Sequence, residues 1–118
     1  MSEIIIVTCS GLSSTGKLTK QAAILFMQRY PGLFDSHILG SNVEGSFLDA
    51  KPECSRIVAV DGCSDCCAKK KLSSCNMNPS GHIVATELGI EKRGAEEPTF
   101  AEIEILVLAI KKSVKRLE

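Results

Sequence analysis

The sequence has no tryptophan, and aromatic residues make up only 4% of its 118 positions. Hydrophobic residues still account for 44% of the chain, so a core has to be built mainly from isoleucine, valine, leucine and alanine. This length suits one compact domain and is too short for two. We therefore expect a single domain over residues 1–118.

An excess of charge of one sign is also missing, because 14 basic residues balance 14 acidic ones. Binding to nucleic acid needs a basic excess that contacts phosphates, so nucleic acid is not expected as a partner. No apolar run approaches the roughly 18 residues of a membrane-spanning helix. The first residues, Met1 to Thr8, lack the basic segment that opens a signal peptide. We expect a cytoplasmic protein with no membrane contact.

Cysteine, in contrast, is abundant, with six residues in this short chain. In a reducing cytoplasm such cysteines are metal ligands or redox thiols more often than structural disulfides. Cys63, Cys66 and Cys67 fall within five positions, directly after the apolar run Ile57 to Val60 and the pair Asp61-Gly62. Cys54 and Cys75 stand apart and fit equally well as small buried apolar residues.

Four short apolar runs predict strands, and the first of them, Glu3 to Thr8, is apolar at nearly every position. Continuous apolarity is typical of a strand covered on both faces, as in a parallel sheet. The other predicted strands are Ser36 to Gly40, Arg56 to Val60 and His82 to Thr86.

Helices are predicted between and after these strands, at Lys17 to Arg29, from Ser41 to about Ala50, from Asp65 through Lys71, and from Pro98 onward. Alternating strands and helices indicate an α/β fold. We therefore predict a small three-layer Rossmann-like domain with a four-stranded parallel sheet in the order 2-1-3-4.

This order would bring the carboxyl ends of strands one and three together, where sites form in open α/β sheets. Cys9 ends the first strand, Cys63 follows the third, and Cys67 lies four residues further on. Helix N-termini aimed at this edge would favour the thiolate form, which binds metal. Three thiolates at one place predict a zinc ion, which takes four Cys or His ligands. His37, in the second strand, is one candidate for the fourth.

The residues around these cysteines resemble the DGC-domain family, which is named for Asp-Gly-Cys. The matching segments cover nearly the whole chain: Cys9-Ser-Gly, Thr15-Gly-Lys-Leu-Thr19, Gln21-Ala-Ala23, Asp61-Gly-Cys63, Cys67-Ala-Lys-Lys70 and Thr86-Glu-Leu-Gly-Ile90. The resemblance implies one zinc ion held by four cysteines. Three of them match as Cys9, Cys63 and Cys67, and the fourth position corresponds to His37. Cys66 is an addition to the family pattern.

Other interpretations of the same residues stay open. Cys63 and Cys66 have the CxxC spacing of thiol-redox pairs. Gly11 to Lys17 nearly spells a phosphate-binding loop, but Leu18 stands where serine or threonine would hold magnesium.

Further groups and choices are also open around the expected metal. Asp61, Lys17 and Glu87 could orient ligands or transfer protons near it. The fourth ligand could be His37, Cys66, water or a substrate, and thiolates suit iron as well as zinc. A metal-binding protein without catalysis is the first hypothesis, and a metal-dependent enzyme the second. The pattern identifies no substrate, protein partner or oligomeric state.

Overall fold

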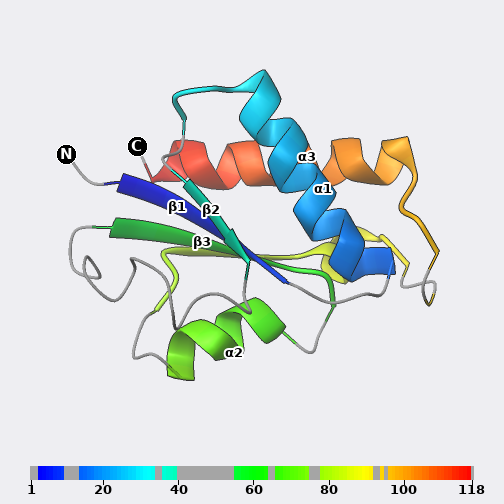
Figure 1. The fold of residues 1–118 in the computed structure, drawn as a ribbon, viewed down its shortest axis with the longest axis horizontal. Coiled ribbons are helices and arrows are strands. Elements are labelled where there is room, and N and C mark those ends of the chain that lie inside the picture. The colour runs from blue at the N-terminus through cyan, green and yellow to red at the C-terminus, as the bar shows by residue number, and fades with distance from the viewer. Residues whose placement is uncertain are drawn as a thin grey trace.

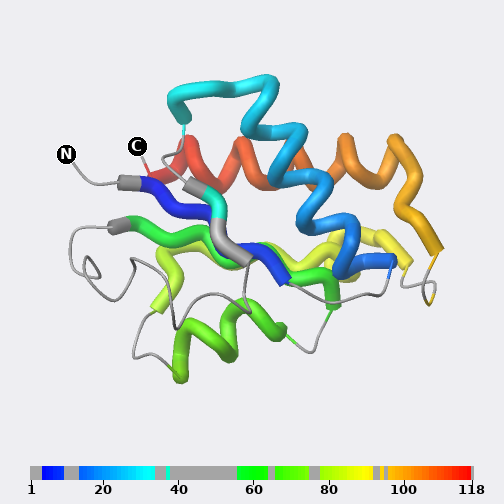
Figure 2. The backbone as a smooth tube through the Cα atoms, viewed as in Figure 1, coloured from blue at the N-terminus to red at the C-terminus, as the bar shows by residue number. Residues whose placement is uncertain are grey.

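The computed structural model describes residues 3–9, 14–33, 36–39, 55–63, 66–74, 78–91, 94 and 96–117. Within them the chain alternates between strands and helices (Figures 1 and 2). In order these are β1 (Glu3–Thr8), α1 (Ser14–Arg29), β2 (Ser36–Leu39), β3 (Ser55–Asp61), α2 (Cys67–Ser74), β4 (Gly81–Val84), the 3-10 helix η3 (Ala85–Leu88) and α3 (Phe100–Arg116).

The strands form one parallel sheet in the order β2-β1-β3-β4. The central pair is β1 and β3, joined in register from Glu3 opposite Ser55 to Thr8 opposite Val60. The predicted mixed α/β fold with a parallel sheet is thereby confirmed, and the strand order is the one that the sequence predicts. The central strands are apolar on both sides because helices cover both faces of the sheet.

The helices form two layers around the sheet. Among the described helices, Figure 1 shows α1 and α3 on one face and α2 on the other. On the first face, alternate residues of β1 and β3 such as Ile6 and Val58 pack with α1 and α3 around the buried Phe26. On the second face, a smaller cluster joins the opposite residues of the same strands to α2: Ile5, Val7, Ile57, Ala59, Ala68 and Leu72. Each face of the sheet therefore has its own core.

Glycine at position 62 allows the end of β3 to lie close to the start of α1. A Cβ added at Gly62 would lie 2.6 Å from the carbonyl carbon of Thr15 and 2.9 Å from the backbone nitrogen of Gly16. Only a residue without a side chain allows this approach, since real Cβ atoms do not come within 3.0 Å of backbone. The start of α1 is also fixed to β1, because the Thr19 hydroxyl donates to the Cys9 carbonyl at 3.1 Å.

The element boundaries differ from the predicted ones in local detail. The last helix begins at Phe100 rather than at Pro98, because Thr99 and Glu102 form a capping box. The fourth strand ends at Val84, and the next residues form η3, with Gly89 in the left-handed conformation at its end. The predicted helix from Ser41 to Ala50 lies outside the described residues. No helix in the described part of the chain is long and apolar enough to cross a membrane.

Candidate metal centre

Asp61 is the last residue of β3 and is completely buried. Its side chain points toward α2, like those of Ile57 and Ala59 on the same strand. One carboxylate oxygen, Oδ1, accepts the backbone N–H of Ala68 at 2.7 Å, and Oδ2 accepts that of Lys69 at 3.3 Å. Asp61 thus caps the first turn of α2 from outside the helix, where unpaired N–H groups and the helix dipole favour an anion.

His82 shares the Asp61 carboxylate with the helix. Its Nε2 lies 2.8 Å from Asp61 Oδ2, and its side chain is 22% exposed. In the sheet His82 pairs with Ala59, two residues before Asp61 on β3, so its ring lies on the α2 face, as the side chain of Asp61 does. A carboxylate only accepts hydrogen bonds, so Nε2 carries the proton of this bond. In the neutral ring, Nδ1 is then left with a lone pair, the form in which a histidine binds metal.

Cys66 precedes α2 and adopts a backbone conformation that is rare for its residue type, with φ of +50°. Two hydrogen bonds hold it there: its N–H donates to the Cys63 carbonyl at 3.1 Å, and its own carbonyl accepts from Lys70 N–H at 2.9 Å. Burial raises the pKa of the Cys66 thiol, and the negative charge of Asp61 raises it further, while Lys69 and Lys70 oppose this. Strained conformations of this kind gather at functional sites.

Asp61, Cys66 and His82 together form a group whose sulfur, nitrogen and oxygen atoms all lie within 4.8 Å of one another. A metal ion needs several acidic, histidine or cysteine side chains close together. Within the residues that the structure describes, this is the one group of three or more such side chains that are close enough. Thiolate, imidazole and carboxylate are the three side-chain ligand types of zinc. The donor set therefore fits a zinc-type cation.

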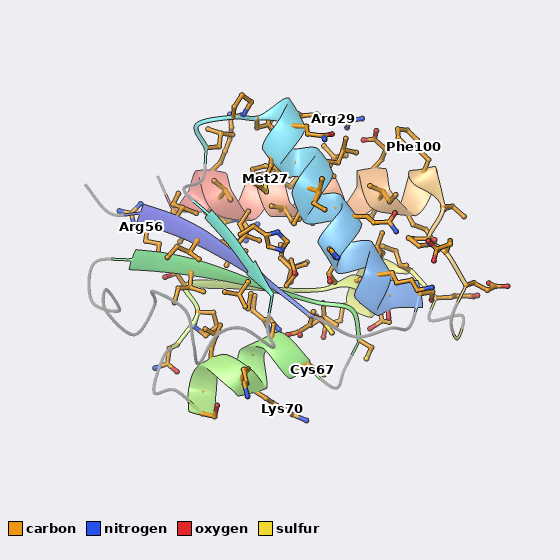
Figure 3. The ribbon with its side chains drawn as sticks, viewed as in Figure 1. Met27, Arg29, Arg56, Cys67, Lys70 and Phe100 are labelled. Atoms are coloured by element: carbon orange, nitrogen blue, oxygen red, sulfur yellow. The ribbon has the colours of Figure 1, made fainter. Side chains whose placement is uncertain are left out.

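The predicted cysteines Cys9, Cys63 and Cys67 do not belong to this group. Cys9 directly follows β1 and is buried, and its N–H donates to the Val60 carbonyl at 3.0 Å, so the backbone ends of β1 and β3 do meet. Cys63 is half-buried after β3, and Cys67 is exposed at the start of α2 (Figure 3). None of the four described cysteines forms a disulfide. Cys54 and Cys75 lie outside the described residues.

His37 occupies the other face of the sheet. It pairs in register with Ile6, which belongs to the core under α1 and α3, and its Nε2 lies 2.8 Å from the Thr8 hydroxyl. Burial lowers the pKa of His37, and the positive charge of Lys20 on α1 lowers it further. The structure thus separates His37 from the group around Asp61 by the thickness of the sheet.

The remaining candidate groups have ordinary surroundings. Lys17 forms an exposed ion pair with Glu97 at 2.7 Å. Glu87 is exposed on η3, where its charge adds to the rise in the pKa of Cys66. Of the predicted phosphate loop, residues 11–13 lie outside the described residues, and Ser14 to Lys17 already belong to the first turn of α1. In Figure 3, Lys70 points away from the sheet, as expected for a solvated lysine on α2.

Sequence reasoning missed His82, which it placed in a strand and gave no role. Strand periodicity alone could not find it, because His82 is assigned to the face of Asp61 only once the register of β4 against β3 is known. The sequence suggests Asp61 as a group that orients ligands or transfers protons near the metal, whereas the structure makes it the contact between β3, β4 and α2.

Comparison with known proteins identifies the family of this chain. The family model of the DGC domain matches residues 5–110. The chain therefore belongs to the DGC domain family, as its Asp-Gly-Cys segment and the spacing of its cysteines indicate. No curated protein and no solved structure matches it.

Proposed function

We propose that this chain, as one domain over residues 1–118, binds a single zinc ion beside the first turn of α2. The observation that carries the proposal is the convergence of Asp61, Cys66 and His82 within 4.8 Å. Its membership of the DGC domain family supports the same function. So does the supply of further thiols at Cys63 and Cys67, which stand on either side of Cys66 along the chain. A reducing compartment such as the cytoplasm would keep these thiols available.

Within the group, Asp61 and His82 have different roles. Two ligand atoms of a tetrahedral zinc stand roughly 3.3–3.8 Å apart, given bonds of about 2.0–2.3 Å. The 2.8 Å between Asp61 Oδ2 and His82 Nε2 is shorter and is a hydrogen bond. Asp61 therefore acts as the carboxylate that orients the ring, and His82 Nδ1 is the nitrogen available to the metal, an arrangement common at zinc sites. Cys66 supplies a thiolate beside it.

The sequence predicts the ligands Cys9, His37, Cys63 and Cys67. We retain the three cysteines of this set as proposed ligands. Those cysteines follow β1 and β3 at the same edge as the group. We propose that the metal is completed from among them and that His82 supplies the histidine in place of His37. A metal closed off by protein ligands would have a structural or transfer role, whereas an open position would permit catalysis.

Metal analysis of purified protein tests this function. We expect about one zinc per chain in the wild type, by the stoichiometry of a structural site. Variants Cys66→Ser and His82→Gln should each lose at least about tenfold in zinc affinity, measured against a competing chelator. The matched control is His37→Gln, which removes the other histidine and should keep wild-type affinity.

Each outcome of this experiment has a distinct meaning. Loss of zinc in His37→Gln with retention in His82→Gln would restore the ligand set predicted from the sequence. A wild-type protein without metal, in which Cys63 and Cys66 form a reversible disulfide, would instead favour thiol-redox function. If iron replaced zinc at the same stoichiometry, the site would stand and only the identity of the metal would change.

A further inference from the structure

A groove of about 520 Å³ runs along the outer side of the sheet, between β4 and α3. Its apolar wall includes three side chains that are large and unusually exposed: Leu88 at 40%, Ile105 at 44% and Leu108 at 53%. Small-molecule sites typically have volumes of 300–1,000 Å³ and mostly apolar walls with a few polar groups. The groove has the size and lining of such a site.

The groove follows from the position of β4 at the edge of the sheet. In the described residues β4 has a strand on one side only, so α3 extends beyond the last strand and keeps part of its apolar surface uncovered. Gly81 lets α3 come close, since a Cβ there would lie 2.5 Å from the Ser113 hydroxyl oxygen. The two walls are thereby held at a fixed separation by backbone and helix.

Charge is distributed unevenly along this groove. Lys112 and Arg116, from the last turns of α3, line the end where β4 begins, next to Ser80 and Gly81. Ile105 and Leu108, earlier on α3, line the end near η3. Glu87 on η3 also lines that end, and its carboxylate repels an acid group there. A ligand lying along the groove therefore meets two cationic side chains at one end, and at the other an apolar surface bordered by one carboxylate.

We propose that this groove binds a small anionic amphiphile, with its acid group on Lys112 and Arg116 and its aliphatic part over Ile105, Leu108 and Leu88. Complementary charge favours a carboxylate or a phosphate ester at the basic end. The apolar side chains contribute by removing hydrocarbon from water. This ligand site goes beyond the proposed zinc function and does not depend on it.

A polypeptide is a poorer occupant of the groove than such an amphiphile. A strand added to β4 would find only four residues to pair with, and short edge strands are a common protection against strand addition. A second copy of the chain, packed groove to groove, is the alternative that the experiment has to separate.

Octanoate is the probe, titrated into the chain of residues 1–118 below its micelle concentration and followed through backbone amide chemical shifts. We expect saturable shifts confined to β4, η3 and α3. Octan-1-ol and octylammonium, which match its chain length, should bind at least about tenfold more weakly, a difference of about 1.4 kcal/mol. Replacing both cations, in Lys112→Gln with Arg116→Gln, should weaken octanoate binding by about the same factor.

The matched control is Lys115→Gln, an exposed lysine on the same turn of α3 that does not line the groove. It should keep octanoate affinity within about twofold. Leu108→Asp should abolish binding, and its circular dichroism spectrum would show whether the fold is intact. Equal binding of octanoate and octylammonium, or equal loss in Lys115→Gln, would overturn the proposal. The proposal would also be overturned if octanoate did not bind and sedimentation velocity showed a dimer that Leu108→Asp dissociates. The groove would then be an interface between two copies of the chain.

Discussion

Removing the Asp61 carboxylate should both destabilise the fold and disturb the candidate metal centre. The size of each effect should depend on which residue replaces Asp61. The carboxylate is completely buried and bonds the N–H groups of Ala68 and Lys69 and the ring of His82. Asp61→Ala deletes all three acceptor contacts and leaves the Ala68 N–H buried, with the Lys69 N–H and the His82 ring part-buried. Asp61→Asn keeps one acceptor oxygen and replaces the other with an amide that donates.

The size of the effect follows from these contacts. Loss of a helix cap costs about 1 kcal/mol, and each buried donor left without an acceptor costs about 1–3 kcal/mol. Since some of the donors would be reached by water after the change, we expect Asp61→Ala to lower the free energy of unfolding by about 3 kcal/mol. Asp61→Asn should lower it by about half as much, because the Ala68 N–H keeps its partner.

The Asn variant also tests the role assigned to the ring. An amide N–H₂ facing His82 Nε2 favours the ring form in which Nε2 accepts and Nδ1 carries the proton. Nδ1 would then lack the lone pair that a metal needs, so zinc affinity should fall although His82 is unchanged. The tautomer can be observed directly from the nitrogen chemical shifts of the His82 ring.

The measurement is urea denaturation followed by circular dichroism, in the presence of a chelator so that bound metal does not add to stability. Glu91→Gln, which changes an exposed carboxylate in the loop after η3, is the control and should change stability by less than about 0.5 kcal/mol. The reasoning would be refuted if Asp61→Ala lost no more stability than Glu91→Gln, or if Asp61→Asn kept both the wild-type tautomer and full zinc affinity.

Two further predictions concern positions around the centre. Gly62→Ala should destabilise by about 2 kcal/mol or more in the same denaturation assay, because its Cβ would lie 2.6 Å from the Thr15 backbone; an unchanged stability would show that α1 can move away at little cost. In metal-free protein, burial and Lys20 lower the pKa of His37 from 6.5, so below that pH the unfolded chain binds more protons. Stability should therefore fall as pH drops through 6.5, and His37→Gln should remove this part of the slope; a slope equal in both proteins would contradict the assignment.

The fold could be predicted because its causes are local and repeated. The β-branched run of β1 and the apolar run of β3 indicate buried parallel strands, and the amphipathic α1 and α3 provide the covering. The same reasoning places Cys9 beside the end of β3, which the bond from its N–H to Val60 confirms. Turn residues determine where each element ends, and these boundaries are harder to predict. One example is β4, which ends early because η3 follows it.

The site could be predicted only in part, because side-chain direction depends on register. Shifting a strand by one residue turns every side chain to the opposite face. The sequence alone gives no register for β2 or β4, so it cannot tell which of His37 and His82 faces α2. Cys66 was recognised as an extra thiol, but its positive φ depends on the turn from Cys63 and on the start of α2.

The chain has two histidines, and the sheet lies between them. Their ring signals in a proton spectrum are therefore paired reporters within one molecule, His82 for events beside α2 and His37 for events beneath α1. If an added ion broadens one resonance and leaves the other unchanged, the affected histidine shows on which side of the sheet the ion binds. No variant is needed for this measurement. An ion that broadens both equally would indicate a global change or a non-specific contact.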